Sequence, residues 1–458
     1  MDLNVVILAA GKGTRMKSRL PKVLQPLARK PLLSHVLQTS LRLKATRVIV
    51  VYGHGGDQVK DQISRQFPGS PIEWVEQREQ LGTGHAVKQA LPQLQDNTRT
   101  LVLYGDVPLT GEDTLNRFLN QVSPGQCGVL TVKLANPKGY GRIIRDHAGV
   151  VREIVEEKDA GEEIRKIGEV NSGILLADTL DLQTWLPKIT NDNAQGEYYL
   201  TDVVKLANDH QVPVIGCLVD NVVEVEGVND KRQLARLERM YQQQLADELM
   251  VAGATLIDPV RIDIRGSVSV GQDCCIDINC IFEGSVTLGD NVQIGANCVI
   301  INSSIADNSV VKPFSHIENA VIGADCDVGP FARLRAGTEL KEHARIGNFV
   351  ETKNTVLGKG SKANHLTYLG DTITGDKVNV GAGTITCNYD GVNKHKTIIG
   401  DGAFIGSNSS LVAPVEIGAG ATVGAGSTIT KDADPNALTV ARAKQITVTG
   451  WKRPEKKK

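Results

Sequence analysis

A glycine loop at residues 8–22, LAAGKGTRMKSRLPK, has the composition of a phosphate-binding turn. It follows an apolar run and carries the cations Lys12, Arg15 and Lys22. Small residues let the backbone approach phosphate oxygens, and the cations balance the charge of a bound triphosphate. Met16 stands where a dinucleotide loop needs its third glycine, and no Walker Gly-Lys-Ser/Thr follows. The loop therefore predicts a nucleotide site of another class, with an ordinary turn bearing solvated charges as the alternative.

Asp106 ends a second apolar run, in the sequence Tyr104-Gly105-Asp106, and is a candidate ligand for magnesium. Mg²⁺ prefers hard oxygen ligands and keeps several waters, so one or two protein groups are enough to hold it. A lone aspartate at such a position is more often a helix N-cap or a turn residue. The Gly-Asp-Val-Pro context favours the metal.

Another group of polar residues lies in the last third of the chain. His365 stands in HLTYLGD, and Asn388 and Tyr389 stand in CNYDG. An amine attacks a thioester only when unprotonated, so acyl transfer near neutral pH needs a base, and histidine has a suitable pKa. A lone histidine is more often a surface or core residue, but this context favours a catalytic base.

Residues before about 230 alternate short β-branched runs with helical patterns, which is typical of a mostly parallel sheet covered by helices on both faces. Ligands of such sheets bind beyond the carboxyl ends of the strands, where the glycine loop and Asp106 fall. We expect strands at residues 5–9, 48–51, 72–75, 100–104, 128–132, 173–176 and 222–225, and helices at 32–43, 84–91 and 200–208.

Residues 230–250 predict one continuous helix that links two domains. At 1.5 Å per residue it would span roughly 30 Å, separating residues 1–229 from residues 251–458. Its apolar residues recur at three- and four-residue steps with no Gly or Pro between them: Leu234, Leu237, Tyr241, Leu245 and Leu249.

A six-residue repeat of apolar positions runs through the chain after residue 260. Six residues form one short strand and one tight turn, and three such units close a triangular coil with the apolar side chain inside. The repeat predicts a parallel β-helix, and each slip in its register predicts a loop that leaves the coil, the last at residues 387–396. The positions are Ile264, Val270, Ile276, Phe282, Leu288, Ile294 and Ile300, then Ile322, Val328, Leu334, Leu340 and Ile346, then Ile399, Ile405, Leu411, Ile417, Val423 and Ile429.

Length and composition narrow the class of protein. A chain of 458 residues is too long for one core and predicts two or three domains. A net charge of −1 gives no support for nucleic-acid or membrane partners. The eight cysteines form no CxxC pair, so we expect reduced thiols in a cytoplasmic protein. The apolar runs are too short for a signal peptide or a membrane span, and we expect neither. The basic end, residues 452–458, is expected to be solvated.

In order and spacing these motifs resemble those of one enzyme family. The glycine loop matches the G-x-G-T-R-M…P-K signature of sugar-phosphate nucleotidylyltransferases. Further matches are QLGTGHA at 80–86, YGDVPL at 104–109, GYGR at 139–142, VEEK at 155–158, VNSG at 170–173 and EGVN at 226–229. With the six-residue repeat, essentially the whole chain resembles the bifunctional N-acetylglucosamine-1-phosphate uridylyltransferase / glucosamine-1-phosphate N-acetyltransferase family.

The resemblance implies that the amino-terminal domain transfers UMP from UTP to N-acetylglucosamine-1-phosphate. Asp106 and Asn229 would hold Mg²⁺, and Arg15 and Lys22 would hold phosphates. The attacking phosphate is already an anion, so no general base is needed. The nucleotide would contact Leu8, Ala9, Ala10, Gly11, Gln77, Gly82, Thr83, Tyr104 and Gly105, and the sugar would lie against Gly141, Glu156 and Asn171.

The resemblance also implies that the carboxy-terminal domain is a left-handed β-helix that acetylates glucosamine-1-phosphate from acetyl-CoA. His365 would be the base. The sugar phosphate would be bound by Arg335, Lys353, Tyr368, Asn379 and Asn388, with Glu351 orienting them. Acetyl-CoA would lie along Ala382, Asn388, Tyr389, Ser407, Ala425 and Arg442. Such β-helices usually pack as trimers with active sites between subunits.

Two alternatives stay open at this point. A monofunctional nucleotidylyltransferase would use its β-helix only for regulation or assembly, but a scaffold has no use for His365 together with Asn388 and Tyr389. A non-enzymatic binding protein would have kept the fold and lost the chemistry, and the presence of Asp106 and Lys22 argues against it.

Overall fold

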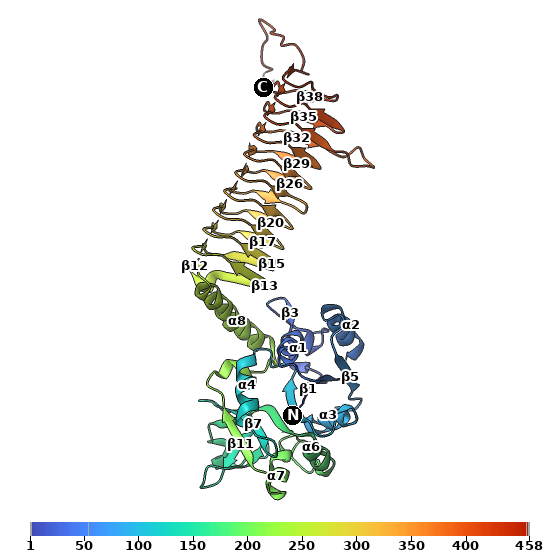
Figure 1. Cartoon of the computed structure of the whole chain (residues 1–458), viewed down its shortest axis with the longest axis vertical. Coiled ribbons are helices and arrows are strands. Elements are labelled where there is room, and N and C mark those ends of the chain that lie inside the picture. Colours follow the sequence, from blue (N-terminus) through green and yellow to red (C-terminus); the bar gives the residue numbers. More distant parts are fainter. Residues whose placement is uncertain (1, 54, 455, 457–458) are drawn as a thin grey trace. The chain divides into compact units, whose positions relative to one another are not determined.

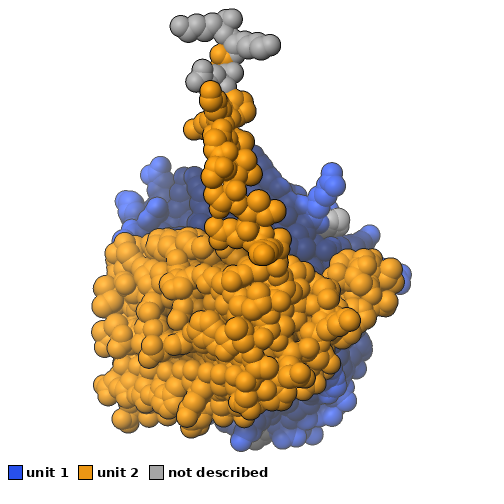
Figure 2. Space-filling model, turned by 90° about the horizontal axis from the view of Figure 1, so that it is seen from above, with its two compact units in different colours: residues 1–241 blue, residues 242–458 orange. Residues whose placement is uncertain are grey.

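The computed structural model describes residues 2–53, 55–454 and 456. These form two compact units, Met1–Tyr241 and Gln242–Lys458, which Figure 2 shows in different colours. Positions 455, 457 and 458 of the predicted basic end lie outside the described residues. Within the described part, no helix combines the length and the hydrophobicity that crossing a membrane requires.

A nine-stranded sheet forms the centre of unit 1 (Figure 1). Strands β1, β4, β5 and β6 pair in parallel, as do β7 and β11, whereas β10 runs antiparallel to both β6 and β7. The mostly parallel sheet is therefore confirmed, with β10 reversed in its middle. The strand order is β11 (Val214–Leu218), β7 (Cys127–Lys133), β10 (Glu169–Asp178), β6 (Arg99–Tyr104), β1 (Leu3–Ala9), β4 (Arg47–Tyr52) and β5 (Ile72–Glu76), and the hairpin of β8 (Arg142–Arg145) and β9 (Val151–Val155) attaches to β10.

Helices cover both faces of this sheet because successive strand side chains point to opposite sides. In β1, Val5 and Ile7 enter one apolar core, while Val6 and Leu8 enter the other. The first core includes residues of α1 (Leu32–Arg42), α2 (Gly56–Gln66) and α4 (Glu112–Gln121), and the second includes residues of α3 (Thr83–Ala90), α6 (Thr179–Trp185) and α7 (Asp202–Asp209). The three predicted helices correspond to α1, α3 and α7 apart from their ends.

One predicted strand is wrong. Residues 222–225 form a 3-10 helix, η5 (Val222–Val225), which begins where the Asn221 side chain accepts a hydrogen bond from the Val223 N–H at 3.2 Å. The strand at this edge of the sheet is β11, whose β-branched pattern is interrupted by Gly216. A Cβ there would lie 2.6 Å from the Arg145 guanidinium and 2.8 Å from Val151 Cγ2, so a side chain would force both neighbours to shift.

Helix α8 (Lys231–Val251) confirms the predicted long helix. In unit 1, its Leu237 is buried in a small core with Met16 and Leu32. In unit 2, the Gln242 amide pairs with the backbone of Ile264, donating to its carbonyl at 2.8 Å and accepting from its N–H at 2.7 Å. The boundary between the units thus falls inside this helix.

Unit 2 is a parallel β-helix of short strands, β12 to β39, stacked coil upon coil (Figure 1). Every predicted repeat position is buried except Val270, which is partly exposed. Close stacking explains the glycines that follow these positions, because a Cβ on Gly406 would lie 2.4 Å from the Ala425 nitrogen of the next coil. The predicted loop leaves the coil after β32 (Ile385–Cys387) and returns at β33 (Thr397–Ile399), as the thin projection in Figure 1.

Leu334→Ala should destabilise unit 2 by about 2–5 kcal/mol, because Leu334 is fully buried and the coil above and below cannot collapse into the cavity. The measurement is the midpoint of urea unfolding of unit 2, followed by circular dichroism. Val321→Ala is the control, since Val321 is 53% exposed, and equal midpoints for the two variants would contradict the core assignment.

Candidate functional site

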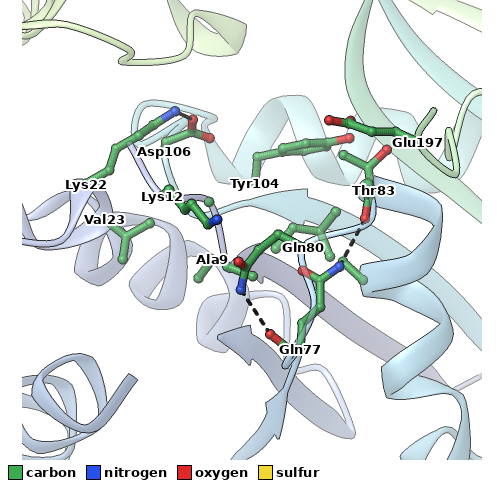
Figure 3. Close-up of a pocket in the computed structure, with 15 residues that line it drawn as sticks. Ala9, Lys12, Lys22, Val23, Gln77, Gln80, Thr83, Tyr104, Asp106 and Glu197 are labelled. Atoms are coloured by element: carbon green, nitrogen blue, oxygen red, sulfur yellow. Dashed lines mark hydrogen bonds and ion pairs between the residues drawn. The ribbon is translucent and has the colours of Figure 1, made fainter. Parts of the chain in front are cut away.

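A cavity of about 460 Å³ lies at the carboxyl ends of β1 and β6 (Figure 3). These two strands pair in parallel, so their carboxyl ends meet at one edge of the sheet. The lining contains the predicted residues Leu8, Ala9, Ala10, Gly11, Lys22, Gln77, Gly82, Thr83, Tyr104 and Asp106, and it adds Lys12, Val23, Gln80, Ala86 and Glu197. Of the added residues, Lys12, Gln80 and Ala86 stand in the motifs, whereas Val23 and Glu197 carry no sequence signal.

Gly105, Arg15 and Asn229 are predicted to contact the nucleotide or its metal but do not line this cavity. Gly105 has a structural role instead. Its N–H donates to the Leu8 carbonyl at 2.9 Å. A Cβ at this position would lie 3.3 Å from the Ala9 Cβ. Gly105 therefore allows β1 and β6 to approach at the floor of the site rather than touching a ligand.

Gln77 is held rigidly at one wall of the cavity. Its Nε2 donates to the Gly82 carbonyl at 3.1 Å and to His85 Nδ1 at 3.0 Å. Gly82 has a φ of 113°, and a Cβ there would lie 2.6 Å from the Tyr198 carbonyl oxygen, so this turn requires glycine. Both bonds use the amide nitrogen, which leaves Oε1 as a fixed hydrogen-bond acceptor.

Two oxygen donors and two cations meet at the mouth of the cavity. The Lys22 ammonium contacts the Asp106 carboxylate and lies 2.9 Å from Asn229 Oδ1. Arg15 Nη2 donates to the same Asn229 oxygen at 2.9 Å. A carboxylate and an amide oxygen that converge on one ammonium also suit a hard divalent cation. In the described residues, no three His, Cys, Asp or Glu side chains are placed so that they could hold a metal ion together. Mg²⁺ needs no such group when phosphates and waters complete its shell.

The predicted sugar contacts lie close to one another, next to Tyr104. The Asn171 N–H donates to the Gly141 carbonyl at 2.9 Å, and Glu156 accepts a hydrogen bond from the Thr201 hydroxyl at 3.1 Å. Burial raises the pKa of Glu156, although the Thr201 hydrogen bond opposes this. Tyr104, Asn171 and Thr201 also line a small cavity that adjoins the main one through Tyr104. Thr201 was not predicted.

His365 lies at the end of β28 (Lys362–His365), directly opposite Asn348 of β25 (Arg345–Asn348). His365 Nδ1 is 2.9 Å from Asn348 Oδ1. An amide oxygen only accepts hydrogen bonds, so Nδ1 carries the proton and Nε2 keeps a free lone pair. This bond thus fixes the orientation of the exposed imidazole. Asn348 was not predicted, although counting back one coil from His365 reaches it.

A strip of small residues continues from His365 along the same corner of the β-helix. Gly383 N–H donates to the Leu366 carbonyl, and Asn408 N–H donates to the Ala382 carbonyl. These bonds place Ala382, Ser407 and Ala425 one coil apart, and Arg442 Nη1 closes the series by donating to the Ala425 carbonyl at 2.7 Å. Four of the six predicted acetyl-CoA residues, Ala382, Ser407, Ala425 and Arg442, therefore form one continuous strip above His365.

The predicted sugar-phosphate residues gather on the face that follows this corner. Glu351 of β26 (Glu351–Lys353) pairs with Tyr368 of β29 (Tyr368–Gly370), and Arg335 Nη1 donates to Glu351 Oε1 at 2.7 Å. Asn388 Nδ2 donates to the Asp371 carboxylate at 2.5 Å.

Lys394 of the inserted loop was not predicted, and it lies beside Lys353. Its hydrogen-bonding contact and its charge lower the pKa of Lys353. The Asp371 carboxylate also interacts with both ammonium groups, which leaves one positive charge among the three side chains and suits an anion. Its position at the basic end of CNYDGVNKHK was the available sequence signal.

Asn379 stands apart from this group, whereas Tyr389 is bridged to Lys394 within the inserted loop. Asn379 belongs to β31 (Asn379–Val380), which pairs with β28 and β34 (Phe404–Ile405) on a different face of the β-helix. Tyr389 lies in the inserted loop and is 60% exposed. One chain thus presents the predicted acetyl-transfer residues on two separate faces.

Comparison with known proteins matches both units to transferases. Residues 5–167 match the MobA-like NTP transferase domain, residues 264–398 the GMPPB C-terminal domain, and residues 396–431 the bacterial transferase hexapeptide (six repeats). The chain is 56% identical to the bifunctional protein GlmU of Cellvibrio japonicus, over 99% of this chain and 100% of that one. Its identity to the Ralstonia nicotianae protein of the same name is 57%, over 100% and 99% of the two chains. The chain belongs to the bifunctional GlmU family.

Membership assigns both reactions of UDP-N-acetylglucosamine synthesis to this chain. The β-helix unit transfers acetyl from acetyl-CoA to glucosamine-1-phosphate. The sheet unit transfers UMP from UTP to the resulting N-acetylglucosamine-1-phosphate and releases pyrophosphate. The monofunctional and non-enzymatic alternatives are not supported.

Asn348→Ala should lower the rate of acetyl transfer about tenfold, because an imidazole that loses its Nδ1 acceptor populates the wrong tautomer and orientation. Initial rates of coenzyme A release measure this effect. The control Asn319→Gly changes an exposed corner of the same β-helix. An unchanged rate in Asn348→Ala would show that His365 needs no such partner.

Proposed function

We propose that Asp106 and Asn229 hold Mg²⁺ during uridylyl transfer and that His365 is the general base of acetyl transfer. We assign the two reactions to residues 1–229 and 251–458, with residues 230–250 linking them. The observation that carries the first assignment is the convergence of the Asp106 and Asn229 oxygens on the Lys22 ammonium. The second rests on the bond between His365 and Asn348.

In uridylyl transfer, a phosphate oxygen of N-acetylglucosamine-1-phosphate attacks the α-phosphorus of UTP, and pyrophosphate leaves from the opposite side. A bound Mg²⁺ supplies positive charge to the triphosphate. Lys22 and Arg15 place further positive charge at the same corner, where it stabilises the transferring phosphate. Gln77 Oε1 is the fixed acceptor for a uracil N–H. Glu156, Asn171 and the Gly141 backbone bind the sugar hydroxyls and acetamide.

In acetyl transfer, His365 Nε2 removes a proton from the amine as the nitrogen attacks the thioester carbonyl. The C–S bond then breaks, and the coenzyme A thiolate leaves and takes up a proton. Lys353, Lys394 and Arg335 hold the phosphate of the sugar. The strip of small residues above His365 leaves room for the pantetheine arm.

We also propose that the β-helix assembles as a homotrimer whose acetyl-transfer sites lie between copies. Asn379 can join the residues of the other face only from a second copy. Phe314, Phe331 and Phe349 stack in a column with ring centroids 4.9 and 5.2 Å apart and are 46–57% exposed. All three adopt a positive φ, which costs a bulky residue about 1–2 kcal/mol. An exposed, strained aromatic column is best explained by a partner surface that covers it.

The proposed setting is the cytoplasm, where thiols stay reduced. All eight cysteines are free, and no disulfide contributes to either unit. The partners we propose are the small-molecule substrates and further copies of the chain, without nucleic acid or a membrane.

The two assignments are separated by one pair of variants. His365→Ala should lower acetyl transfer by about 100-fold or more and leave uridylyl transfer intact, and Asp106→Ala should do the reverse. Release of the coenzyme A thiol with glucosamine-1-phosphate and no UTP measures the first reaction, and pyrophosphate release measures the second. Loss of both activities in either folded variant would contradict two independent sites.

Phe331→Asp should shift the mass measured by sedimentation from three copies to one, because a charge in the middle of the aromatic column opposes its burial. Val321→Asp places the same charge on another exposed strand of the β-helix and should leave the mass unchanged. A wild-type chain that sediments as one copy would contradict the assembly.

A further inference from the structure

The inserted loop between β32 and β33 contains a hydrogen bond between His395 and Asp390 to which neither reaction assigns a role. His395 Nε2 lies 2.7 Å from Asp390 Oδ2. The other Asp390 oxygen accepts hydrogen bonds from the N–H groups of Val392 at 2.8 Å and Asn393 at 2.6 Å. The hydrogen bond from His395 holds the pKa of Asp390 well below its usual range. Asp390 is therefore a charged anchor for both ends of this turn.

These bonds shape the loop into a small hairpin. Tyr389 and Lys394 form an antiparallel bridge, and the His395 N–H donates to the Asn388 carbonyl at 2.8 Å. Tyr389 is 60% exposed and Val392 is 84% exposed, so no apolar core supports the hairpin. A two-stranded hairpin without a core is marginally stable in water. Its shape therefore depends on the polar contacts, among which the pair of Asp390 and His395 is charged.

Lys394 is placed among opposing charges. Lys394 and Arg335 lower the pKa of Lys353, whereas the Asp371 carboxylate attracts both lysines. The base of the hairpin is fixed by Asn388, which donates to the Asp371 carboxylate at 2.5 Å. This contact leaves the tip of the hairpin free to turn, so a second constraint is needed to fix where Lys394 lies beside Lys353.

We propose that the pair of Asp390 and His395 is a clasp that holds Lys394 beside Lys353, so that the two ammonium groups form a preorganised seat for the phosphate of glucosamine-1-phosphate. Asp390 and His395 are positioning residues, because neither touches the reacting atoms. Preorganisation of this kind affects substrate binding more than the chemical step. The inference rests on the acetyl-transfer site proposed above and adds the device that sets its affinity for the sugar phosphate.

The test compares His395→Ala, Asp390→Asn and His395→Gln in the full-length chain. The first two variants should raise the KM for glucosamine-1-phosphate about tenfold, the typical effect of one lost charge-assisted hydrogen bond. They should leave kcat and the KM for acetyl-CoA within about twofold. Inorganic phosphate should inhibit them about tenfold more weakly than the wild type. His395→Gln keeps an N–H donor and should restore much of the affinity.

His343→Ala is the matched control. His343 Nδ1 lies 3.8 Å from Asp325 Oδ2 at an exposed corner of the same β-helix, so this variant removes a similar pair away from the hairpin. It should behave as the wild type. Uridylyl transfer by the other unit reports that each variant is folded and correctly quantified.

Three results would overturn the clasp. An unchanged KM for glucosamine-1-phosphate in His395→Ala would show that Lys394 needs no such support. A fall in kcat with an unchanged KM would make His395 part of the chemistry instead. An equal loss in His343→Ala would reduce the effect to general stability. Absence of sugar-phosphate-dependent coenzyme A release in the wild type would instead overturn the acetyl-transfer assignment, and the clasp with it.

Discussion

Parallel pairing between neighbouring strands brings distant residues to the same height, and both sites depend on it. In unit 1, Leu8 of β1 pairs with Tyr104 of β6, so the glycine loop and Asp106 emerge at one edge of the sheet. In unit 2, Asn348 pairs with His365. The backbone hydrogen bonds therefore set which side chains meet, and the side chains contribute only their chemistry.

The two sites handle phosphate with cations that are balanced in different ways. In unit 1, the Lys22 charge is compensated by the Asp106 carboxylate, and the neutral Asn229 oxygen accepts from both Lys22 and Arg15. In unit 2, the two cations Lys353 and Lys394 lie together with one carboxylate, Asp371, nearby. That carboxylate also accepts a hydrogen bond from Asn388. The first arrangement suits a substrate that brings a metal ion, and the second suits a phosphate that neutralises the ammonium groups itself.

The sequence predicted regular, repeated features well and local exceptions poorly. The six-residue repeat identified the β-helix core because each inward position must be apolar. The inserted loop was located by the slip in the register of that repeat. The strand predicted at residues 222–225 was wrong because a single Asn221 side chain starts a 3-10 turn. The true edge strand, β11, was missed because Gly216 makes room for Arg145, a contact that only the folded sheet reveals.

The chain by itself determined the motifs, the repeat and the predicted site residues, since small residues near phosphates, hard oxygens near magnesium and a histidine near an amine follow from chemistry. Only the tertiary structure decided which neighbouring side chains contact the predicted site residues. Asn348 orients His365, Thr201 binds Glu156, and Lys394 reaches Lys353 from an inserted hairpin. Such partners lack a local pattern, because their contacts arise from strand register and loop closure across many residues.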